Sequence, residues 1–168
     1  MKPNILKYLP NNTAPIRHIV SRPSQVLSVY KQETGGVLHI TIDSGATVSI
    51  IIEKAAKRCG FTISRASQTA CQADGYSQLQ VVGEIHSTVT RDKVTMPFEA
   101  LVVKQLCNAE CLGGMNFIHD NEILPRPWAK TIEVKGKHQF PETNPINIEK
   151  AMPVTAIIER KQSSLSSN

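Results

Sequence analysis

The strongest structural signal in this chain is the segment Val37-Leu38-His39-Ile40-Thr41-Ile42-Asp43-Ser44-Gly45-Ala46. Its apolar residues Leu38, Ile40 and Ile42 alternate with polar residues, which is the period-two pattern of a strand that buries one face. The polar face ends at Asp43, and Ser44-Gly45-Ala46 breaks the strand. Asp-Ser-Gly also makes an ordinary turn after a strand, so its meaning depends on the surrounding elements.

The residues on either side of this segment also favour strands. We expect strands at 26–29, 48–52, 79–90 and 94–103, and final short strands at 123–124 and 131–134, because these runs are apolar and rich in β-branched residues. The best helical segment is 53–59, with Gly60 placed to end it. Residues 112–118 predict a turn that leads into a short helix.

A hairpin is predicted in the middle of the chain. The strand-like runs 69–73 and 79–85 flank Asp74-Gly75-Tyr76-Ser77, and Asp-Gly between two such runs is a strong hairpin signal. Few apolar residues are available to hold its tip, so we expect the tip to be mobile.

The composition indicates one soluble domain with β structure. The 168 residues carry a net charge of +5, with 40% hydrophobic and 5% aromatic residues, which suits a single domain with extended ends. The basic residues do not form a stripe with stacking aromatics, so we expect no nucleic-acid partner. No run is long enough to span a bilayer, and the start lacks the apolar core of a signal peptide. We therefore expect no membrane partner and an intracellular protein.

Prolines and polar residues divide the chain into three parts. Residues 1–24 contain four prolines and predict an irregular leader or linker. We assign the folded domain to 25–140. Residues 141–168 become polar and end in a serine-rich run, so we predict a disordered tail.

The cysteines do not indicate a metal centre or a disulfide framework. Cys107 and Cys111 have a spacing that could hold a metal, but no paired histidine motif follows. We therefore expect Cys59, Cys71, Cys107 and Cys111 to be reduced, buried thiols. No metal and no cofactor are expected.

Three motifs, in this order, resemble the retropepsin-like family of aspartic proteases from retroviruses, retrotransposons and their domesticated relatives. They are Asp43-Ser44-Gly45-Ala46 after a strand, Ala73-Asp74-Gly75 in the hairpin, and Gly114-Met115-Asn116-Phe117-Ile118 near the end of the domain. The resemblance covers roughly residues 25–134. Two positions depart from the usual pattern. Gly113 stands where relatives usually have Leu or Ile, which predicts looser packing beside the site, and Asn116 replaces the commoner Asp.

The resemblance implies both a fold and a site. The fold would be all-β, a small closed acid-protease (retropepsin-like) barrel with one or two short helices. Asp43, Ser44 and Gly45 would be catalytic, with Gly45 allowing close approach of backbones and Ser44 hydrogen-bonding across a two-fold axis. The substrate would contact a further set of residues: Ala46, Thr47, Leu112, and Ala73, Asp74, Gly75 and Tyr76 of the hairpin, which would act as a flap.

The expected activity is endopeptidase cleavage of an extended polypeptide, in a polyprotein of retroelement type, in the cytoplasm or within a virus-like particle. Two nearby carboxylates share one proton and so supply both a base and an acid. Because the sequence contains one Asp-Ser/Thr-Gly triplet, we expect a C2 homodimer with one Asp43 from each subunit. Two alternatives remain: an inactive dimerisation module of the same fold, and a host regulatory protease linked to ubiquitin.

Four further residues have plainer interpretations. Asp74 is not expected to be a second catalytic carboxylate, because its place in an Asp-Gly turn already explains it. Tyr76, beside the tip of the hairpin, has the plainer role of covering a strand. His39 is expected to be a surface or partly buried polar residue, not a base. Trp128 is expected to anchor packing.

Overall fold

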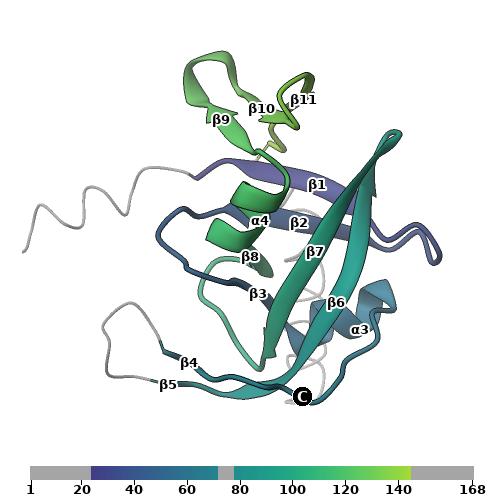
Figure 1. Cartoon of the computed structure of the whole chain (residues 1–168), viewed down its shortest axis with the longest axis vertical. Coiled ribbons are helices and arrows are strands. Elements are labelled where there is room, and N and C mark those ends of the chain that lie inside the picture. Colours follow the sequence, from purple (N-terminus) through teal and green to yellow (C-terminus); the bar gives the residue numbers. More distant parts are fainter. Residues whose placement is uncertain (1–23, 72–77, 145–168) are drawn as a thin grey trace, which may run out of the picture.

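The computed structural model describes residues 24–71 and 78–144 as a closed six-stranded barrel with two short helices, so the predicted fold class is confirmed (Figure 1). The barrel strands are β1 (Val26–Tyr30), β2 (Val37–Ile42), β3 (Ser49–Ile52), β6 (Val81–Arg91), β7 (Val94–Val103) and β8 (Cys111–Gly113). They lie in the order β1-β2-β8-β3-β7-β6. The helices are α3 (Glu53–Cys59) and α4 (Met115–Asp120).

The strand order separates β2 from β3, although they follow each other in sequence. Strand β8 lies between them, parallel to β2 and antiparallel to β3. The connection from β2 to β3, residues 43–48, must therefore pass the end of β8. This crossing brings the loop that begins with Asp43 against the residues that follow Gly113.

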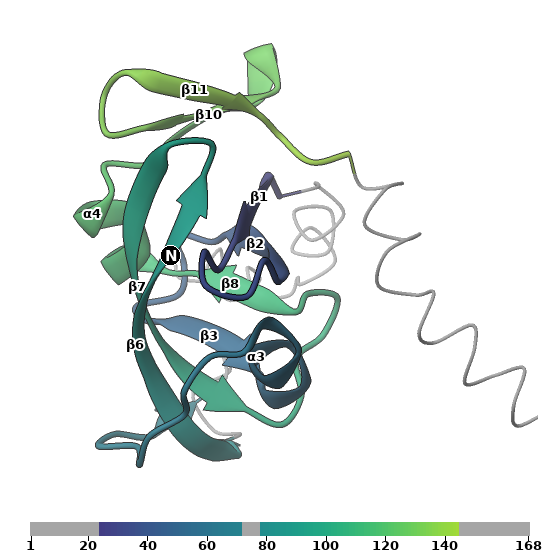
Figure 2. The ribbon, with the colours of Figure 1, turned by 90° about the vertical axis from the view of Figure 1, so that its right-hand side faces the viewer.

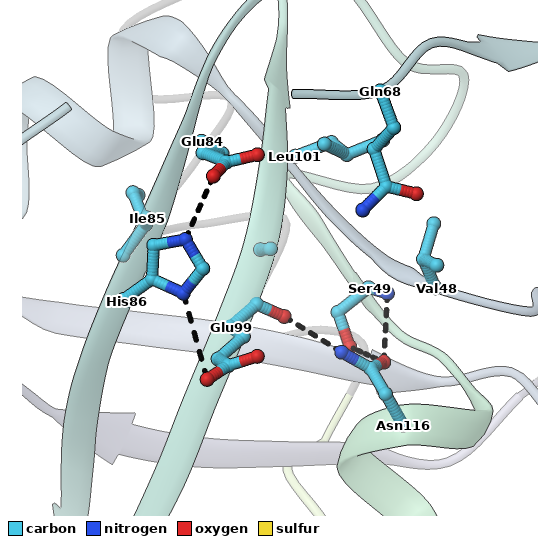
Figure 3. A pocket seen from close by; sticks show the side chains of 10 residues that line it. Val48, Ser49, Gln68, Glu84, Ile85, His86, Glu99, Leu101 and Asn116 are labelled. Atoms are coloured by element: carbon cyan, nitrogen blue, oxygen red, sulfur yellow. Dashed lines mark hydrogen bonds and ion pairs between the residues drawn. The ribbon is translucent and has the colours of Figure 1, made fainter. Parts of the chain in front are cut away.

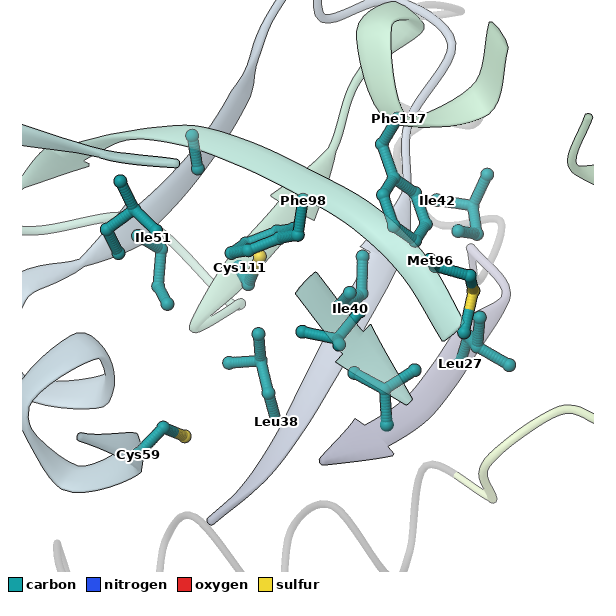
Figure 4. Close-up of a cluster of buried hydrophobic side chains, with 14 of the residues drawn as sticks. Leu27, Leu38, Ile40, Ile42, Ile51, Cys59, Met96, Phe98, Cys111 and Phe117 are labelled. Carbon is teal, nitrogen blue, oxygen red and sulfur yellow. The ribbon is translucent and has the colours of Figure 1, made fainter. Parts of the chain in front are cut away.

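The alternation predicted for residues 37–42 is present in β2. Leu38 and Ile40 are fully buried and Ile42 nearly so, and they face a core that also contains Phe98 (Figure 4). Phe117 of α4 enters this core, with its ring 6.1 Å from that of Phe98. Such aromatic contacts stabilise beyond the area they bury, so α4 is fixed to the barrel beside the 43–48 loop.

Helix α3 forms where the sequence predicts it. Ala55, Ala56 and Cys59 are its buried residues. Lys57 lies 3.1 Å from Glu53 in an i,i+4 ion pair, an arrangement that supports exposed helices. Gly60 ends the helix at φ 80°, a left-handed conformation that glycine adopts without strain.

A second sheet follows α4. It consists of β9 (Leu124–Arg126), β10 (Thr131–Val134) and β11 (His138–Pro141), in the order β11-β10-β9, with the 3₁₀ turn η1 (Pro127–Ala129) after β9. Its inner face joins the core through Ile132, Val134 and Phe140. In both Figure 1 and Figure 2 this sheet lies at one end of the barrel and α3 towards the other. Strand β11 is absent from the sequence prediction.

The residues after β11 are tied back to the start of the barrel. The Thr143 N–H donates to the Val26 carbonyl at 2.7 Å. The Gln25 side-chain amide donates to Glu142 at 2.6 Å and to the Thr131 carbonyl at 3.1 Å. The division of the chain at residues 24 and 140 stays a prediction.

Parts of the predicted leader and tail, residues 1–23 and 145–168, lie outside the described residues. None of the described helices is long and apolar enough to cross a membrane.

Candidate active site

Asp43 lies directly after the last residue of β2, on the loop that crosses the end of β8. Its N–H donates to the Gly113 carbonyl at 2.9 Å, and its carbonyl accepts from Ala46 N at 3.1 Å. Its side-chain Oδ1 accepts from Gly45 N at 2.9 Å. Among residues 24–71 and 78–144, Gly45 N is the donor to the Asp43 carboxylate. This hydrogen bond closes an Asx turn, which orients the carboxylate.

The carboxylate is reachable from outside. Asp43 is half-buried, while Ser44 and Gly45 are exposed. A Cβ at Gly45 would lie 3.2 Å from Asp43 Oδ1, which is closer than most Cβ atoms in proteins approach a neighbouring atom. Glycine at this position therefore keeps the carboxylate uncrowded.

Gly114 allows the loop and the start of α4 to touch backbone to backbone. Met115 N donates to the Ala46 carbonyl at 2.7 Å. A Cβ at Gly114 would lie 2.5 Å from the Val48 carbonyl oxygen and 2.7 Å from that of Ala46, so no other residue fits without a shift. Sequence reasoning placed this glycine in a motif but did not identify this contact.

Ser49, the first residue of β3, and Asn116 form a second link between the end of the loop and α4, as Figure 3 shows. Asn116 Oδ1 accepts from Ser49 N at 2.9 Å and from Ser49 Oγ at 2.8 Å. Asn116 Nδ2 donates to the Glu99 carbonyl at 2.9 Å, and Ser49 Oγ accepts from Gly114 N at 3.0 Å. The donation to Glu99 needs an amide, which gives a physical reason for Asn in place of Asp. Sequence reasoning missed Ser49; a serine inside a β-branched run was the available signal.

The prediction of looser packing at Gly113 is wrong. A Cβ there would lie 2.7 Å from Ile40 Cγ2 and 3.0 Å from Phe117 Cδ2. The side chains of Ile40 and Phe117 already fill the space that a Leu or Ile would occupy, so the core beside the site is closed.

The residues expected to bind substrate fall into two groups. Thr47 is exposed, Ala46 is half-buried, and Leu112 is a half-buried residue of β8 that pairs with Thr41 and Ile50. The other group, Ala73, Asp74, Gly75 and Tyr76, lies outside the described residues. The strands that flank it, β4 (Ala70–Cys71) and β5 (Gln78–Leu79), are paired antiparallel, so the hairpin is confirmed and the role of its tip stays a prediction.

A small cavity of about 50 Å³ opens beside the loop, lined on one side by Val48, Ser49 and Asn116. Asp43 is not among the residues that line it. Across the cavity lies His86 of β6, whose Nε2 is 2.8 Å from Glu84 and whose Nδ1 is 3.5 Å from Glu99 (Figure 3). Two hydrogen bonds raise the pKa of His86 above its usual 6.5: the one to Glu84 has the larger effect and the one to Glu99 the smaller. Sequence reasoning did not identify this cluster, because its members alternate along two strands with no motif.

Two other predicted roles can be judged from burial. His39 is half-buried, as expected, with Nδ1 2.9 Å from Ser28 Oγ, and burial lowers its pKa. The prediction that Trp128 anchors packing is wrong, because this residue is 76% exposed.

All four cysteines are free. Cys59 and Cys111 are buried, and burial raises the pKa of both thiols. Cys71 and Cys107 are exposed, so the expectation of burial is wrong for these two. Cys71 ends β4 of the hairpin, and Cys107 lies on the connection between β7 and β8. Neither belongs to the core.

Comparisons with known proteins identify the family of the chain and support its fold. The family model described as "gag-polyprotein putative aspartyl protease" matches residues 34–120, more than half of the chain. None of the curated proteins is significantly similar in sequence.

Among solved structures, the retroviral protease-like domain of Ddi1 from Leishmania major is similar at a TM-score of 0.59 and 16% identity, covering 73% of this chain and 96% of that one. The EIAV protease, complexed with the inhibitor HBY-793, is similar at a TM-score of 0.47 and 12% identity, over 60% of this chain and 89% of that one. With its closed barrel and its family match around Asp43, the chain belongs to the retropepsin-like aspartyl protease family.

Proposed function

We propose that the chain is an aspartic endopeptidase that acts as a homodimer, with one Asp43 from each subunit. The observation that carries the proposal is the position of Asp43, which directly follows β2 and precedes the exposed residues Ser44 and Gly45. Its carboxylate is oriented by Gly45 N at 2.9 Å, and its N–H donates to the Gly113 carbonyl at 2.9 Å. The sequence contains one such Asp-Ser-Gly triplet, so a pair of catalytic carboxylates requires two chains.

The chemistry follows from holding two carboxylates close together. Both cannot ionise cheaply, so the pair keeps one proton and titrates as a unit. The ionised carboxylate takes a proton from water as it attacks the peptide carbonyl, and the protonated one donates to the leaving nitrogen. Ser44, exposed beside Asp43, would hydrogen-bond to the partner's loop and hold the two carboxylates in register.

The substrate would be an extended peptide segment bound as a strand between the barrel and the two hairpins. Ala46, Thr47 and Leu112 would contact it from the barrel, and residues 73–76 would cover it and exclude water. The name of the matching family supports a polyprotein as the substrate class. Processing would then take place in the cytoplasm or within a virus-like particle.

The test is a peptide-cleavage assay with Asp43→Asn and Asp43→Ala, scored together with the melting temperature. Both variants should lose cleavage by at least about a thousandfold in kcat, with the fold retained. Asp120→Asn, an exposed carboxylate at the end of α4, is the matched control and should cleave normally. Cleavage by Asp43→Asn at the wild-type rate would refute the proposal. A wild-type protein that dimerises but cleaves no peptide would favour the inactive dimerisation module instead.

A further inference from the structure

The cavity in Figure 3 lies between the two elements that the proposed function assigns to the substrate. Val48, at the end of the 43–48 loop, lines it, and so does Gln68, two residues before β4 of the hairpin. Strands β6 and β7 contribute most of the other lining residues. A substrate strand that contacts Ala46 and Thr47 therefore passes this cavity, and alternate side chains of such a strand point toward the barrel.

The size of the cavity limits what can enter it. Its volume is about 50 Å³, and one water needs about 10–15 Å³ of such space, so there is room for a short row of about three to five water-sized groups. Lysine fits this space, because it consists of a narrow four-carbon stem with a compact ammonium. The planar guanidinium of arginine and the rings of aromatic side chains are broader than such a row.

The apolar part of the lining suits an aliphatic stem. Val48 is half-buried, and Ile85 and Leu101 are buried. A lysine stem covers apolar surface of this kind while its charged head stays beside polar groups and water.

The polar part of the lining contains two carboxylates. The Ser67 N–H and Oγ donate to Glu84 Oε1 at 3.0 and 3.1 Å, and His86 lies 2.8 Å from Glu84 Oε2. The hydrogen bond with His86, then that with the Ser67 N–H, lowers the pKa of Glu84 below its usual 4.5. The Glu99 side chain is 59% exposed and 3.5 Å from His86 Nδ1, so its carboxylate is open to a further donor.

His86 does not cancel this negative charge. Of the described residues that line the cavity, it is the one that can become positive. Two carboxylates and one imidazolium leave a net charge of −1, and a neutral imidazole leaves −2. In either state a cation is favoured over a neutral side chain of the same shape, and an anion is disfavoured.

We propose that this cavity is a specificity subsite that takes a lysine side chain of the substrate, with the stem against Val48 and Leu101 and the ammonium at Glu99 and Glu84. The inference rests on the proposed function, because a strand bound along the 43–48 loop is what brings a side chain to the cavity. It adds a substrate class to that function: polypeptides with a lysine close to the cleaved bond.

Matched peptides test this preference. Each position close to the cleaved bond of one peptide is occupied in turn by lysine, by norleucine, which has the same stem without the charge, and by glutamate. At one position, kcat/KM should be at least about fivefold higher for lysine than for norleucine, and lowest for glutamate. Equal values for lysine and norleucine at every position would overturn the proposal.

Variants of Glu99 test the source of the preference. Glu99→Gln should lower the lysine-to-norleucine ratio by at least about threefold, and Glu99→Lys should make the glutamate peptide better than the lysine peptide. The side chain is exposed, so both variants should fold. Asp120→Asn is the matched control, since Asp120 is exposed and does not line the cavity, and it should keep the wild-type ratio. A wild-type ratio in Glu99→Lys would also overturn the proposal.

Binding without cleavage gives an independent measurement. The Asp43→Asn chain is mixed with the lysine or the norleucine peptide, and the ring signals of His86 are followed by NMR. The lysine peptide should shift these signals more than the norleucine peptide, because its ammonium enters between the carboxylates that contact the ring. Equal shifts would overturn the proposal.

The outcomes separate this inference from the proposed function. If the wild-type chain cleaves peptides through Asp43 without a preference for lysine, the subsite is wrong while the protease assignment stands. If it cleaves no peptide, yet the lysine peptide shifts the His86 signals more than the norleucine peptide, the subsite stands and the protease assignment fails.

Discussion

Replacing Asn116 by Ala should weaken both the fold and the site. The change removes two hydrogen bonds from Ser49, at 2.9 and 2.8 Å, and the one to the Glu99 carbonyl at 2.9 Å. Ser49 is fully buried, so its N–H would lose its acceptor where water does not easily replace it. Such a group costs about 1–3 kcal/mol, and each further bond about 1 kcal/mol. We expect a loss of about 2–4 kcal/mol, which lowers the melting temperature by on the order of 10 °C.

Urea unfolding followed by circular dichroism measures this loss. Asn116→Asp is the informative comparison, since it keeps the acceptor for Ser49 and loses the donation to Glu99; it should cost about 1–2 kcal/mol. Gln139→Ala, at an exposed position of β11, should change stability by less than about 0.5 kcal/mol.

The same variant separates positioning from stability. Well below its melting temperature, Asn116→Ala should lower kcat more than it raises KM, because the loop that holds Asp43 is less fixed while substrate contacts remain. A loss of stability below about 0.5 kcal/mol, together with unchanged kcat, would refute the reasoning.

Three further predictions concern the rest of the barrel. Glu110 is buried, and its Oε1 lies 2.9 Å from Arg58 in an ion pair. Arg58→Met should lower the free energy of unfolding in urea by about 2–3 kcal/mol, less than for a fully buried pair because Arg58 is half exposed. An unchanged free energy of unfolding would contradict this. The pKa of His86, measured by NMR, should lie above 6.5, and Glu84→Gln should lower it. The stability from this pairing is present below about pH 6.5 and disappears as pH rises through the raised pKa. A pKa at or below 6.5 would count against the pairing. Gly113→Ala should cost about 1–3 kcal/mol by overpacking, measured as a fall in melting temperature, whereas a stabilised variant would show that the site has room after all.

Features that depend on neighbouring residues in sequence could be predicted. The alternation in residues 37–42 identified β2 and its buried face, and residues 53–60 identified α3 with its glycine stop. Both signals are local, because a repeat of two or of 3.6 residues places side chains on one face whatever the rest of the chain does. The triplet at Asp43 was recognisable because it occurs with the 73–75 and 114–118 motifs in the order typical of the retropepsin-like family.

Contacts that depend on the order of strands in the barrel could not be predicted from neighbouring residues in the sequence. The sequence does not show that β8 lies between β2 and β3, and this insertion is what brings Gly114 and Asn116 against Ala46 and Ser49. The packing at Gly113 was misjudged for the same reason, because the filling side chains come from β2 and α4. Trp128 was misjudged because a large apolar residue is usually buried in its own chain.

Mixing experiments test most directly whether two chains build one site. Wild-type chains and Asp43→Asn chains are unfolded together, refolded at constant total concentration well above the dimer dissociation constant, and assayed for peptide cleavage. If each site needs two Asp43 carboxylates, activity falls with the square of the wild-type fraction, and equal amounts leave about one quarter of the activity. If each chain carries its own site, activity falls in proportion to the wild-type fraction, equal amounts leave about one half, and the account is contradicted.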